Sequence, residues 1–381
     1  MIGVVHLITG LNTGGAETML FKLLSMTDRQ RFRPVVVSLK SGGTLADRIR
    51  ELGVEVYGAD MRSRIPSPSK WLRLGSLVRR LAPDILQGWM IYGNLAAQTL
   101  SWRSGSRPRV LWNMRHSLHD LKMERRTTAA VVRAMAGLSS QPVSILYNSA
   151  TSARQHEARG YDARKTRVIP NGFDSHLFRP DPEARASLRS EMGINDRTPL
   201  IGLVARYHPV KDHTNFLRAA RLLVSAGSPA RFLMIGRDTD GPEVRAAVDR
   251  LDLRRQVVGL GERSDLARLT AGLDIATCCS VAESFPNSVG EAMSCGVPCV
   301  VTTRPASPGL GDSAWMVGEA GRVVPPRDSA ALCDAWRGLL WLPPERRRQL
   351  GETARARVLG QFSLDRIVNQ YESLYTEVAD D

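Results

Sequence analysis

The sequence has few cysteines, and their arrangement argues against a disulfide framework and against a zinc site. Their number is odd, and no two are spaced as a Cys-x-x-Cys pair. Disulfide-rich domains use an even number of cysteines, and structural zinc sites use closely spaced Cys or His pairs. We therefore expect small buried thiols in a reducing compartment, the cytoplasm. The cysteines are Cys278, Cys279, Cys295, Cys299 and Cys333.

The chain also lacks a long hydrophobic run. No uncharged apolar stretch reaches the roughly 18 residues that a transmembrane helix needs. The start, MIGVVHLITG, lacks the basic leader and cleavage site of a signal peptide and is typical of a buried strand. No basic helix interleaved with aromatic residues and no single-strand stacking module favours nucleic-acid binding. We expect a cytoplasmic protein without a membrane span and without a nucleic-acid partner.

Acidic residues are scarce in the first half of the chain. Residues 1–180 contain 27 Lys and Arg but only 12 Asp and Glu, whereas the rest of the chain contains 25 and 26. The whole net charge of +14 therefore comes from the first half. Such an excess indicates a surface for anionic lipid, for an anionic substrate or for nucleic acid, unless it is merely a solvated basic surface.

What the chain does contain is an alternation of short apolar runs and amphipathic helices, which predicts βαβ units and a parallel sheet. A polar, proline-rich stretch near 172–195 interrupts the pattern, which then restarts. We expect two doubly wound, Rossmann-like α/β domains, residues 1–180 and 181–361, that face a central cleft. The expected helices lie at 15–26, 45–53, 71–83, 93–104, 212–226, 241–252, 264–271, 287–295, 329–341, 344–359 and 363–378.

Two groups of residues could hold a phosphate. Gly14 and Gly15 open the first helix, where the backbone can approach an anion closely and amide groups are available to bind it. Their spacing fits neither the G-x-G-x-x-G fingerprint nor a P-loop, so a plain tight turn remains an alternative. In the second domain Arg206 ends an expected strand and Lys211 precedes a helix. The two cations could aim at one diphosphate, or they could be an unrelated surface pair.

The segment AESFPNSVGEAM places two carboxylates around the start of another helix. Glu283 lies in the loop that leaves a strand, and Glu291 lies in the first turns of the helix, where Gly290 leaves room on its surface. We expect each glutamate to accept hydrogen bonds from a different sugar of one sugar–diphosphate–ribose ligand. A solvated loop acid and a helix-terminal charge are the structural alternative.

The helix start itself would face the anion between those two sugars. Asn287 is a favourable N-cap residue, so the amides of Ser288 and Val289 would point out of the helix towards a phosphate.

Taken together, these segments resemble glycosyltransferase family 4, the retaining enzymes of the GT-B fold, over nearly the whole chain. The resemblance implies a nucleotide-sugar substrate, UDP- or GDP-linked, a metal-independent reaction without cofactors, and a last helix, residues 362–381, that returns to the first domain. The segments are GGAE (14–17), PNGFD (170–174), ARYHPVKD (205–212), ESFPNSVGE (283–291), EAMSCGVPCVVT (291–302) and GRVVPPRD (321–328).

The resemblance also implies roles for individual residues. Arg206 and Lys211 would stabilise the leaving diphosphate, with the Gly14–Gly15 turn opposite them. Glu291 would bind the ribose hydroxyls and Glu283 the transferred sugar.

A histidine is implied as well. In WNMRHSLHD, His116 matches the family's active-site histidine beside the transferred sugar, and His119 is a nearby rival.

Some readings stay open. ESFPN departs from the commoner family pattern at Pro286, so no sugar identity is carried over. A nucleotide-sugar 2-epimerase of the same fold is the alternative enzyme, and a basic nucleic-acid-binding protein is the alternative of another class. A glycosidase would need both carboxylates flanking one bond, which Glu291 on a helix does not suit.

The acceptor can be addressed only through the charge. Residues 62–80, RSRIPSPSKWLRLGSLVRR, contain Trp71, Leu72 and six basic residues. We expect this segment to dock on the anionic inner face of the cell membrane, where the enzyme would meet a glycan linked to polyprenyl diphosphate for surface polysaccharide. A basic solvated helix is the alternative.

Overall fold

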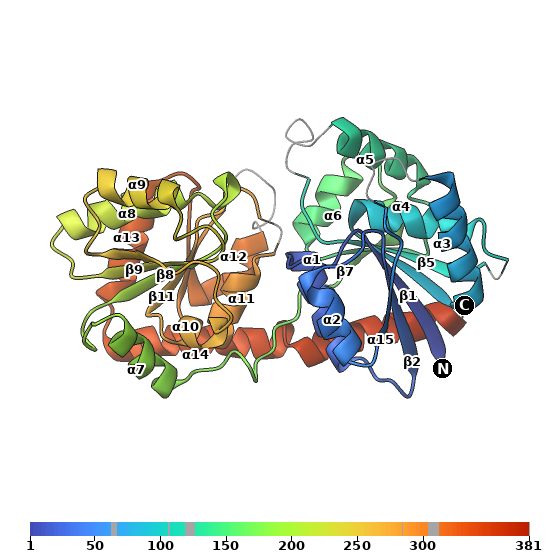
Figure 1. The fold of residues 1–381 in the computed structure, drawn as a ribbon. Helices are drawn as coiled ribbons and strands as arrows, with labels where there is room; N and C mark the ends of the chain where they lie inside the picture. The colour runs from blue at the N-terminus through green and yellow to red at the C-terminus, as the bar shows by residue number, and fades with distance from the viewer. Residues whose placement is uncertain (62–66, 106, 119–125, 284, 304–311, 381) are drawn as a thin grey trace. The chain divides into compact units, whose positions relative to one another are not determined.

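The computed structural model describes residues 1–61, 67–105, 107–118, 126–283, 285–303 and 312–380. The chain divides into two compact units, each built around one parallel sheet (Figure 1). Unit 1 comprises Met1–Gly172 and Leu364–Asp381, and unit 2 comprises Phe173–Ser363. The sequence placed the division eight residues later, at 180, because it took the polar stretch for a linker, whereas Phe173 is fully buried within unit 2.

Unit 1 has a parallel sheet in the order β3-β2-β1-β4-β5-β6-β7. Its strands are β1 (Ile2–Ile8), β2 (Phe32–Ser38), β3 (Glu55–Gly58), β4 (Ile85–Trp89), β5 (Arg109–Met114), β6 (Ser144–Tyr147) and β7 (Thr166–Val168). Its helices are α1 (Gly15–Met26), α2 (Thr44–Glu51), α3 (Pro68–Leu81), α4 (Met90–Ser101), α5 (Arg126–Leu138), α6 (Ala150–Glu157) and α15 (Leu364–Asp380).

Unit 2 repeats the architecture with the strand order β10-β9-β8-β11-β12-β13. Its strands are β8 (Leu200–Val204), β9 (Arg231–Ile235), β10 (Val257–Gly259), β11 (Ile275–Cys278), β12 (Cys299–Thr302) and β13 (Gly321–Val324). Its helices are α7 (Pro182–Glu191), α8 (His213–Ser225), α9 (Pro242–Arg250), α10 (Leu266–Ala271), α11 (Asn287–Ser294), α12 (Asp312–Val317), α13 (Ser329–Leu340) and α14 (Pro344–Gln361). The expected α/β class with two doubly wound parallel sheets is therefore confirmed.

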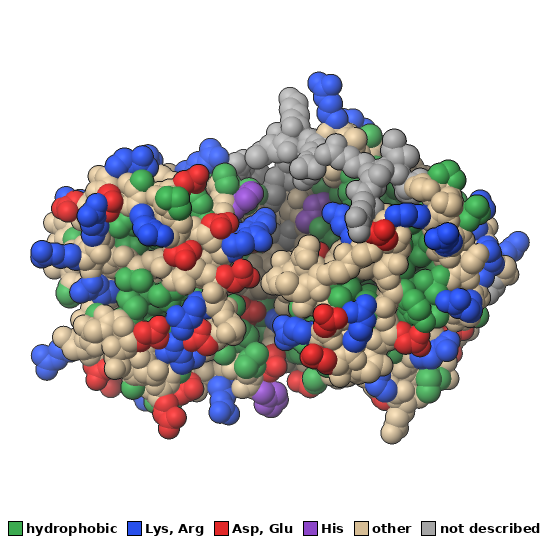
Figure 2. Space-filling model, in the orientation of Figure 1, with side chains coloured by type: hydrophobic (Ala, Val, Ile, Leu, Met, Phe, Trp, Pro, Cys, Tyr) green, Lys and Arg blue, Asp and Glu red, His purple; other side chains and the backbone are tan. Residues whose placement is uncertain are grey.

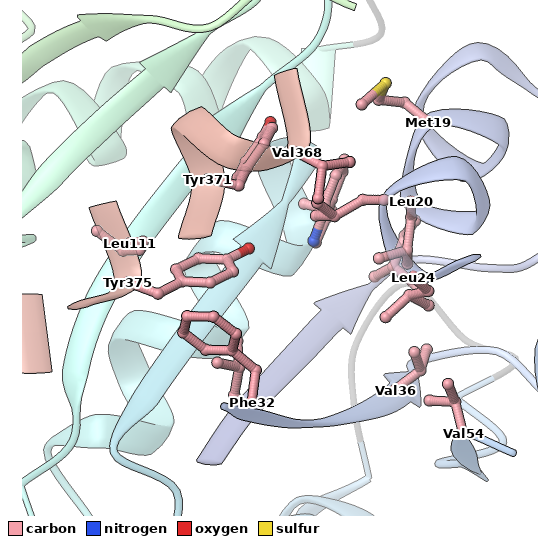
Figure 3. Packing of buried hydrophobic residues seen from close by; sticks show 14 of the residues in the cluster. Met19, Leu20, Leu24, Phe32, Val36, Val54, Leu111, Val368, Tyr371 and Tyr375 are labelled. Carbon is pink, nitrogen blue, oxygen red and sulfur yellow. The ribbon is translucent and has the colours of Figure 1, made fainter. Parts of the chain in front are cut away.

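Each sheet is buried on both faces, as all-parallel sheets are. In unit 1, one hydrophobic cluster joins the sheet to α1, α2 and α15, and a second joins its other face to α3, α4, α5 and α6. Figure 3 shows Tyr371 and Tyr375 of α15 lying against the first face, where Tyr375 meets Phe32 edge-on at 5.8 Å between ring centroids. The last helix thus supplies large aromatic side chains to the core of unit 1.

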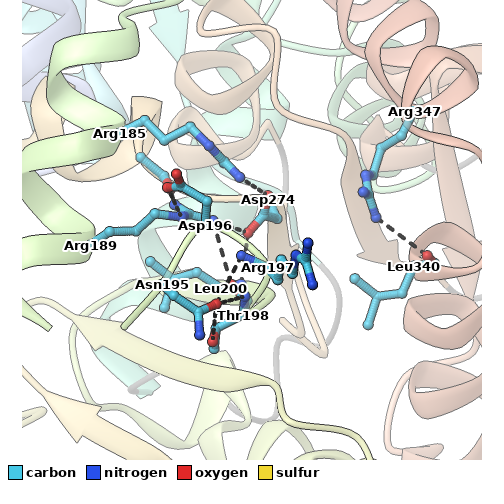
Figure 4. A network of polar contacts seen from close by, with 11 residues as sticks. Arg185, Arg189, Asn195, Asp196, Arg197, Thr198, Leu200, Asp274, Leu340 and Arg347 are labelled. Carbon is cyan, nitrogen blue, oxygen red and sulfur yellow. Dashed lines mark hydrogen bonds and ion pairs between the residues drawn. The ribbon is translucent and has the colours of Figure 1, made fainter. Parts of the chain in front are cut away.

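In each sheet an aspartate just before a central strand accepts a hydrogen bond from a backbone amide of the neighbouring strand. The Asp84 carboxylate, just before β4, accepts from the amide of Gly3 in β1 at 2.7 Å. The Asp274 carboxylate, just before β11, accepts from the amide of Leu200 in β8 at 2.8 Å (Figure 4). Arg189 of α7, which is 2% exposed, also binds Asp274 at 2.6 Å. These contacts fix the amino ends of the strands whose carboxyl ends carry the candidate site.

The surface carries mixed charge. Figure 2 shows Lys and Arg side chains over both units, with Asp and Glu among them. None of the helices in the described part of the chain is both long enough and apolar enough to span a bilayer.

Candidate active site

The strand order of unit 2 identifies where a ligand would bind. The sequence order of the strands reverses between β8 and β11, and open α/β sheets bind ligands at the carboxyl ends of such a pair. Arg206 follows β8 by two residues and is exposed, and Lys211 ends a short 3₁₀ turn, Pro209–Lys211, in the same loop. Glu283 lies in the loop that follows β11. Three of the residues singled out in the sequence therefore flank one switch point.

Two of these residues are in direct contact. The Lys211 ammonium donates to Oε2 of Glu283, and the two side chains are 27% and 21% exposed. Burial alone would lower the pKa of Lys211, but the Glu283 carboxylate outweighs that effect and raises the pKa above its usual value. Lys211 is therefore a half-buried cation in the candidate site.

Further residues that the sequence did not single out hold Glu283 in place. The Ser280 hydroxyl donates to the same carboxylate oxygen, Oε2 of Glu283, at 3.0 Å. The Thr302 hydroxyl, at the end of β12, donates to the Ser280 carbonyl at 2.7 Å. A serine after a strand and a threonine in a neighbouring strand are too common for the sequence to have marked them.

The helix that carries Glu291 begins and ends as its sequence suggests, with one shift. Pro286 is the N-cap and Asn287 is already helical, so the expected capping role of Asn287 is wrong. The proline fixes its own φ near the value that the helix start needs. At the other end Gly296 has φ +70°, and its amide donates to the Met293 carbonyl at 3.0 Å in a Schellman turn.

The amides at this helix start are only partly as expected. Ser288 occupies the second helical position, where no preceding turn of helix can accept from its amide. The Val289 amide instead donates to the Pro286 carbonyl at 3.2 Å, and Val289 is 2% exposed. Glu291 is half-buried, one turn into the helix.

Gly290 does not leave space for a ligand. A Cβ at this position would lie 2.1–2.5 Å from atoms of the Phe173 ring. Phe173 in turn stacks on Phe285, which belongs to the same loop as Glu283, with ring centroids 6.0 Å apart. The glycine therefore lets the Phe173 ring pack against α11, and the expectation of free space for a ligand is wrong.

The loop between β8 and α8 has its own internal supports. Asp212 adopts a left-handed conformation with φ +49°, and its carboxylate caps the helix by accepting from the Asn215 amide at 3.2 Å. His213 is 2% exposed, and burial lowers its pKa to about 4. A neutral histidine thus lies next to Lys211 without adding a second charge.

One Asp-x-Asp triplet lies in unit 2, at Asp238–Asp240 in the loop after β9. Thr239 at its centre is buried and donates to the Gly236 carbonyl at 2.8 Å, while both aspartates are exposed. Asp238 also lines a cavity of about 670 Å³ beside the β8–α8 loop. Within the described ranges no group of three or more His, Cys, Asp or Glu side chains could hold a metal ion.

In unit 1, Gly14 and Gly15 lie at the expected helix start. Gly14 is the N-cap of α1 and Gly15 its first residue, at the carboxyl end of β1 and beside the switch point with β4. The Glu17 carboxylate lies against Gly14, with Oε2 at 2.4 Å from where a Cβ would stand. Burial raises the pKa of Glu17. A carboxylate of the chain itself thus lies at this helix start.

His116 follows β5, the strand next to β4 in unit 1, and is half-buried. The preceding Arg115 is 8% exposed and donates to Asn171 at 2.6 Å and to the Ile169 carbonyl at 2.9 Å. Arg115 thereby ties the segment after β5 to the segment after β7, just before the chain passes into unit 2. The rival His119 lies outside the described residues.

The candidate residues thus form two groups. Gly14, Gly15 and His116 belong to unit 1, and the others belong to unit 2. The second group is Arg206, Lys211, Glu283, Asn287, Ser288, Val289 and Glu291.

Comparison with known proteins gives two family matches, one in each unit. A family model described as Glycosyltransferase Family 4 matches residues 13–177, and one described as Glycosyl transferases group 1 matches residues 198–341. EpsF of Bacillus subtilis (strain 168), which is named as a glycosyltransferase, is 24% identical over 81% of this chain and 82% of its own length.

Two further relatives match shorter stretches. The N-acetyl-alpha-D-glucosaminyl L-malate synthase of Bacillus anthracis is 31% identical over 51% of this chain and 49% of its own length. The UDP-Gal:alpha-D-GlcNAc-diphosphoundecaprenol alpha-1,3-galactosyltransferase of Escherichia coli is 26% identical over 37% of each chain.

Solved structures show the same fold. HepE of Anabaena, solved in complex with UDP and glucose, superposes with a TM-score of 0.85 at 20% identity, covering 99% of this chain and 100% of that one. The GT-B fold expected from the sequence is therefore confirmed.

Proposed function

Because the chain belongs to glycosyltransferase family 4, we propose that it moves a sugar from a UDP- or GDP-linked donor to a glycan acceptor carried on a lipid diphosphate. We further propose that the reaction retains the anomeric configuration and needs no metal ion. The observation that carries the donor half of this proposal is the contact between Lys211 and Glu283 at the switch point of unit 2.

This contact suits the junction between a sugar and its diphosphate. A cation binds phosphate oxygens, and a carboxylate binds sugar hydroxyls. Because the two groups touch, a ligand that engages both must place its sugar–phosphate bond beside them. Relatives and neighbours support such a donor: one relative is named for UDP-Gal, and HepE was solved with UDP and glucose.

The leaving group would be stabilised by fixed charge. As the bond to the sugar breaks, negative charge grows on the diphosphate. Arg206 and Lys211 supply positive charge there, and the Ser288 amide at the start of α11 supplies a hydrogen-bond donor. Glu291, one turn further along α11, would accept from the ribose hydroxyls. His116 of unit 1 would act on the side of the reacting sugar.

The donor assignment predicts how single substitutions divide nucleotide binding from sugar binding. Lys211→Ala should weaken binding of the free nucleoside diphosphate about 10- to 100-fold, since a hydrogen bond to a charged group is worth about 1.5–3 kcal/mol. Glu283→Ala should bind the nucleoside diphosphate at least as tightly as the parent, because Lys211 loses a competing carboxylate. It should lose the extra affinity for the intact sugar nucleotide.

Calorimetry with UDP, GDP and their glucose and galactose derivatives, all in excess EDTA, measures these affinities. Arg250→Ala and Glu352→Ala, on exposed positions of the same unit, are the matched controls. Equal losses in Lys211→Ala and Glu283→Ala for both ligand types would contradict the separate roles. Binding or transfer that disappears in EDTA and returns with Mn²⁺ would overturn metal independence and point to Asp238 and Asp240.

The acceptor half rests on α3. Its buried side packs Leu74 and Val78 into unit 1, and its exposed side presents Leu72, Arg73 and Arg79, followed by Arg80. Trp71 packs against the core, and Lys70 pairs with Asp60 at 3.2 Å, so both are less available than the sequence suggested. Arg62 and Arg64 lie outside the described residues. We propose that this exposed side meets anionic lipid on the cytoplasmic face of the membrane.

A further inference from the structure

A hydrogen bond from α6 fixes the backbone at His116. The Ser152 hydroxyl donates to the His116 carbonyl at 2.7 Å, across 36 positions of sequence. Ser152 is fully buried, and its own amide donates to the hydroxyl of Ser149, the N-cap of α6, at 3.1 Å. The start of this helix is therefore linked directly to the segment that follows β5.

Two other buried serines of unit 1 use their hydroxyls differently. Ser101 ends α4 and Ser139 directly follows α5, and each donates to a carbonyl three residues earlier, at 2.8 Å and 2.6 Å. The Ser139 hydroxyl also accepts from the Asp162 amide at 2.9 Å, whereas the Ser101 bond stays within α4. A serine that only needed to satisfy its hydroxyl could have done the same. Ser152 instead donates to a residue of the candidate site.

His156 stands one turn further along α6 and continues the chain of contacts. Its Nδ1 lies 2.8 Å from the Ser152 carbonyl, and because a carbonyl only accepts, Nδ1 carries the proton. Its ring meets the His116 ring edge-on, at 88° and 5.8 Å between centroids. His156 therefore contacts the His116 ring directly, and it is linked to the His116 backbone through Ser152.

The surroundings keep His156 uncharged. It is 0% exposed, and burial lowers its pKa to about 3 despite the bond to the Ser152 carbonyl. Tyr147 and Tyr161 enclose it at ring distances of 5.1 Å and 5.0 Å. A neutral, confined imidazole can hold its neighbour in one orientation without repelling a proton that the neighbour carries.

We propose that Ser152 and His156 are positioning residues for His116: the serine fixes its backbone and the histidine limits the rotation of its imidazole. The inference rests on the proposed role of His116 beside the reacting sugar. Neither residue touches the substrate in this scheme. Both act by holding one side chain in the geometry that transfer requires.

A double-mutant cycle tests the inference. Ser152→Ala should lower kcat about 10- to 100-fold with little change in the donor KM, because misplacement of a reacting group by about 1 Å costs on that order. In the His116→Ala background the same substitution should cause no further loss, since there is no imidazole left to position. Ser101→Ala, which removes a buried hydroxyl whose bond stays within α4, should leave kcat unchanged in both backgrounds.

A spectroscopic measurement covers the case in which the wrong donor is supplied or Ser152→Ala fails to fold. The Cε1–H proton resonance of His116 is assigned by its absence in His116→Ala. Its line width or titration midpoint should change in Ser152→Ala and in His156→Phe, which keeps an aromatic ring but not the Nδ1 donor. It should stay constant in Ser101→Ala.

The outcomes separate the inference from the proposed function. If His116→Ala transfers sugar normally, the role of His116 is wrong and there is nothing to position. If His116→Ala is impaired but Ser152→Ala is not, or if Ser152→Ala costs the same in both backgrounds, only the inference is overturned. An unchanged His116 resonance in both α6 variants overturns it as well.

Discussion

At the scale of single residues, the absence of a side chain at Gly290 lets the Phe173 ring pack directly against α11. The Phe173 ring occupies the space that a Cβ would need, and Phe285 stacks on that ring. Both phenylalanines are buried, at 0% and 4% exposure. The helix that carries Glu291 and the loop that carries Glu283 therefore share one aromatic support.

Gly290→Ala should destabilise unit 2 by about 1–3 kcal/mol, because the added methyl group overpacks a rigid ring. Gly338→Ala in α13 is the matched control: a Cβ there would meet nothing within 4 Å, so the substitution should stabilise the helix by about 0.5–1 kcal/mol. Urea unfolding measures both changes. Destabilisation of equal size at the two positions would mean that the Phe173 contact is not the cause.

At this scale the sequence indicated which residues belong to the candidate site, but it did not indicate which of them touch one another. Arg206, Lys211 and Glu283 could be chosen because each follows a strand in an alternating pattern. That Lys211 and Glu283 touch could not be foreseen, because 72 positions separate them and only the pairing of β8 with β11 brings their loops together. Gly290 was misread for the same reason: its partner, Phe173, lies at the start of unit 2, far from Gly290 in the sequence.

At the scale of elements, the last helices of the chain were predicted and several earlier ones were missed. The last three helices lie at Ser329–Leu340, Pro344–Gln361 and Leu364–Asp380, close to their expected bounds. The helix α5 was missed, although Ala129, Val132 and Met135 recur every three residues and are its buried face. The helices α6 and α7 were missed as well: they are short, and their buried apolar residues are only Ala153 in α6 and Ala184 and Leu188 in α7. For helices of this kind tertiary packing decides more than local pattern.

The helix α3 predicts a measurable interaction with lipid. Each arginine near an anionic surface contributes about 1 kcal/mol, so three exposed arginines should give weak, salt-sensitive binding. Substituting Arg73, Arg79 and Arg80 by Glu should abolish sedimentation with vesicles that contain phosphatidylserine at low salt. Substituting Arg250, Arg346 and Arg348, which are exposed in unit 2, changes the charge equally and should leave binding in place.

If the parent protein ignores anionic vesicles at low salt, the membrane proposal fails. A small soluble acceptor then becomes the better assignment. The donor assignments in unit 2 do not depend on that result.

At the scale of the whole molecule, charge and titration divide between the units. Unit 1 contains 27 Lys and Arg against 16 Asp and Glu, a net +11, and unit 2 contains 25 against 22, a net +3. The first half looked more basic in the sequence because the acidic residues of α15 come last in the chain. In the folded protein these acidic residues belong to unit 1, so the net positive charge of unit 1 is lower than that of residues 1–180.

Buried histidines predict how acid affects stability. Burial lowers the pKa of His6 and His156 to about 3 in unit 1, and that of His213 to about 4 in unit 2. Below the ordinary pKa of about 6.5 the unfolded chain takes up protons that the folded chain refuses, so stability falls as the pH falls. The loss should approach about 1.4 kcal/mol per pH unit for each histidine, and should be steeper in unit 1.

Urea unfolding between pH 7 and pH 4.5 measures this dependence. His6→Asn should lower stability at pH 7, because Trp89 Nε1 donates to His6 Nδ1 at 3.2 Å, yet it should flatten the slope with pH. His176→Asn, at an exposed position, should change neither. A slope that is the same in His6→Asn as in the parent would rule out this histidine as a source of acid sensitivity.

The return of α15 to unit 1 has a consequence for synthesis on the ribosome. Tyr371 and Tyr375 are almost fully buried in unit 1, yet all of unit 2 is translated before them. While the ribosome makes residues 173–363, α1 and α2 can already cover part of this face, but the aromatic contacts of α15 with Phe32 and Trp89 are missing. Unit 2 can therefore close its core first, although domains usually fold in the order of their synthesis. The nascent first sheet remains a candidate client for chaperones until α15 emerges.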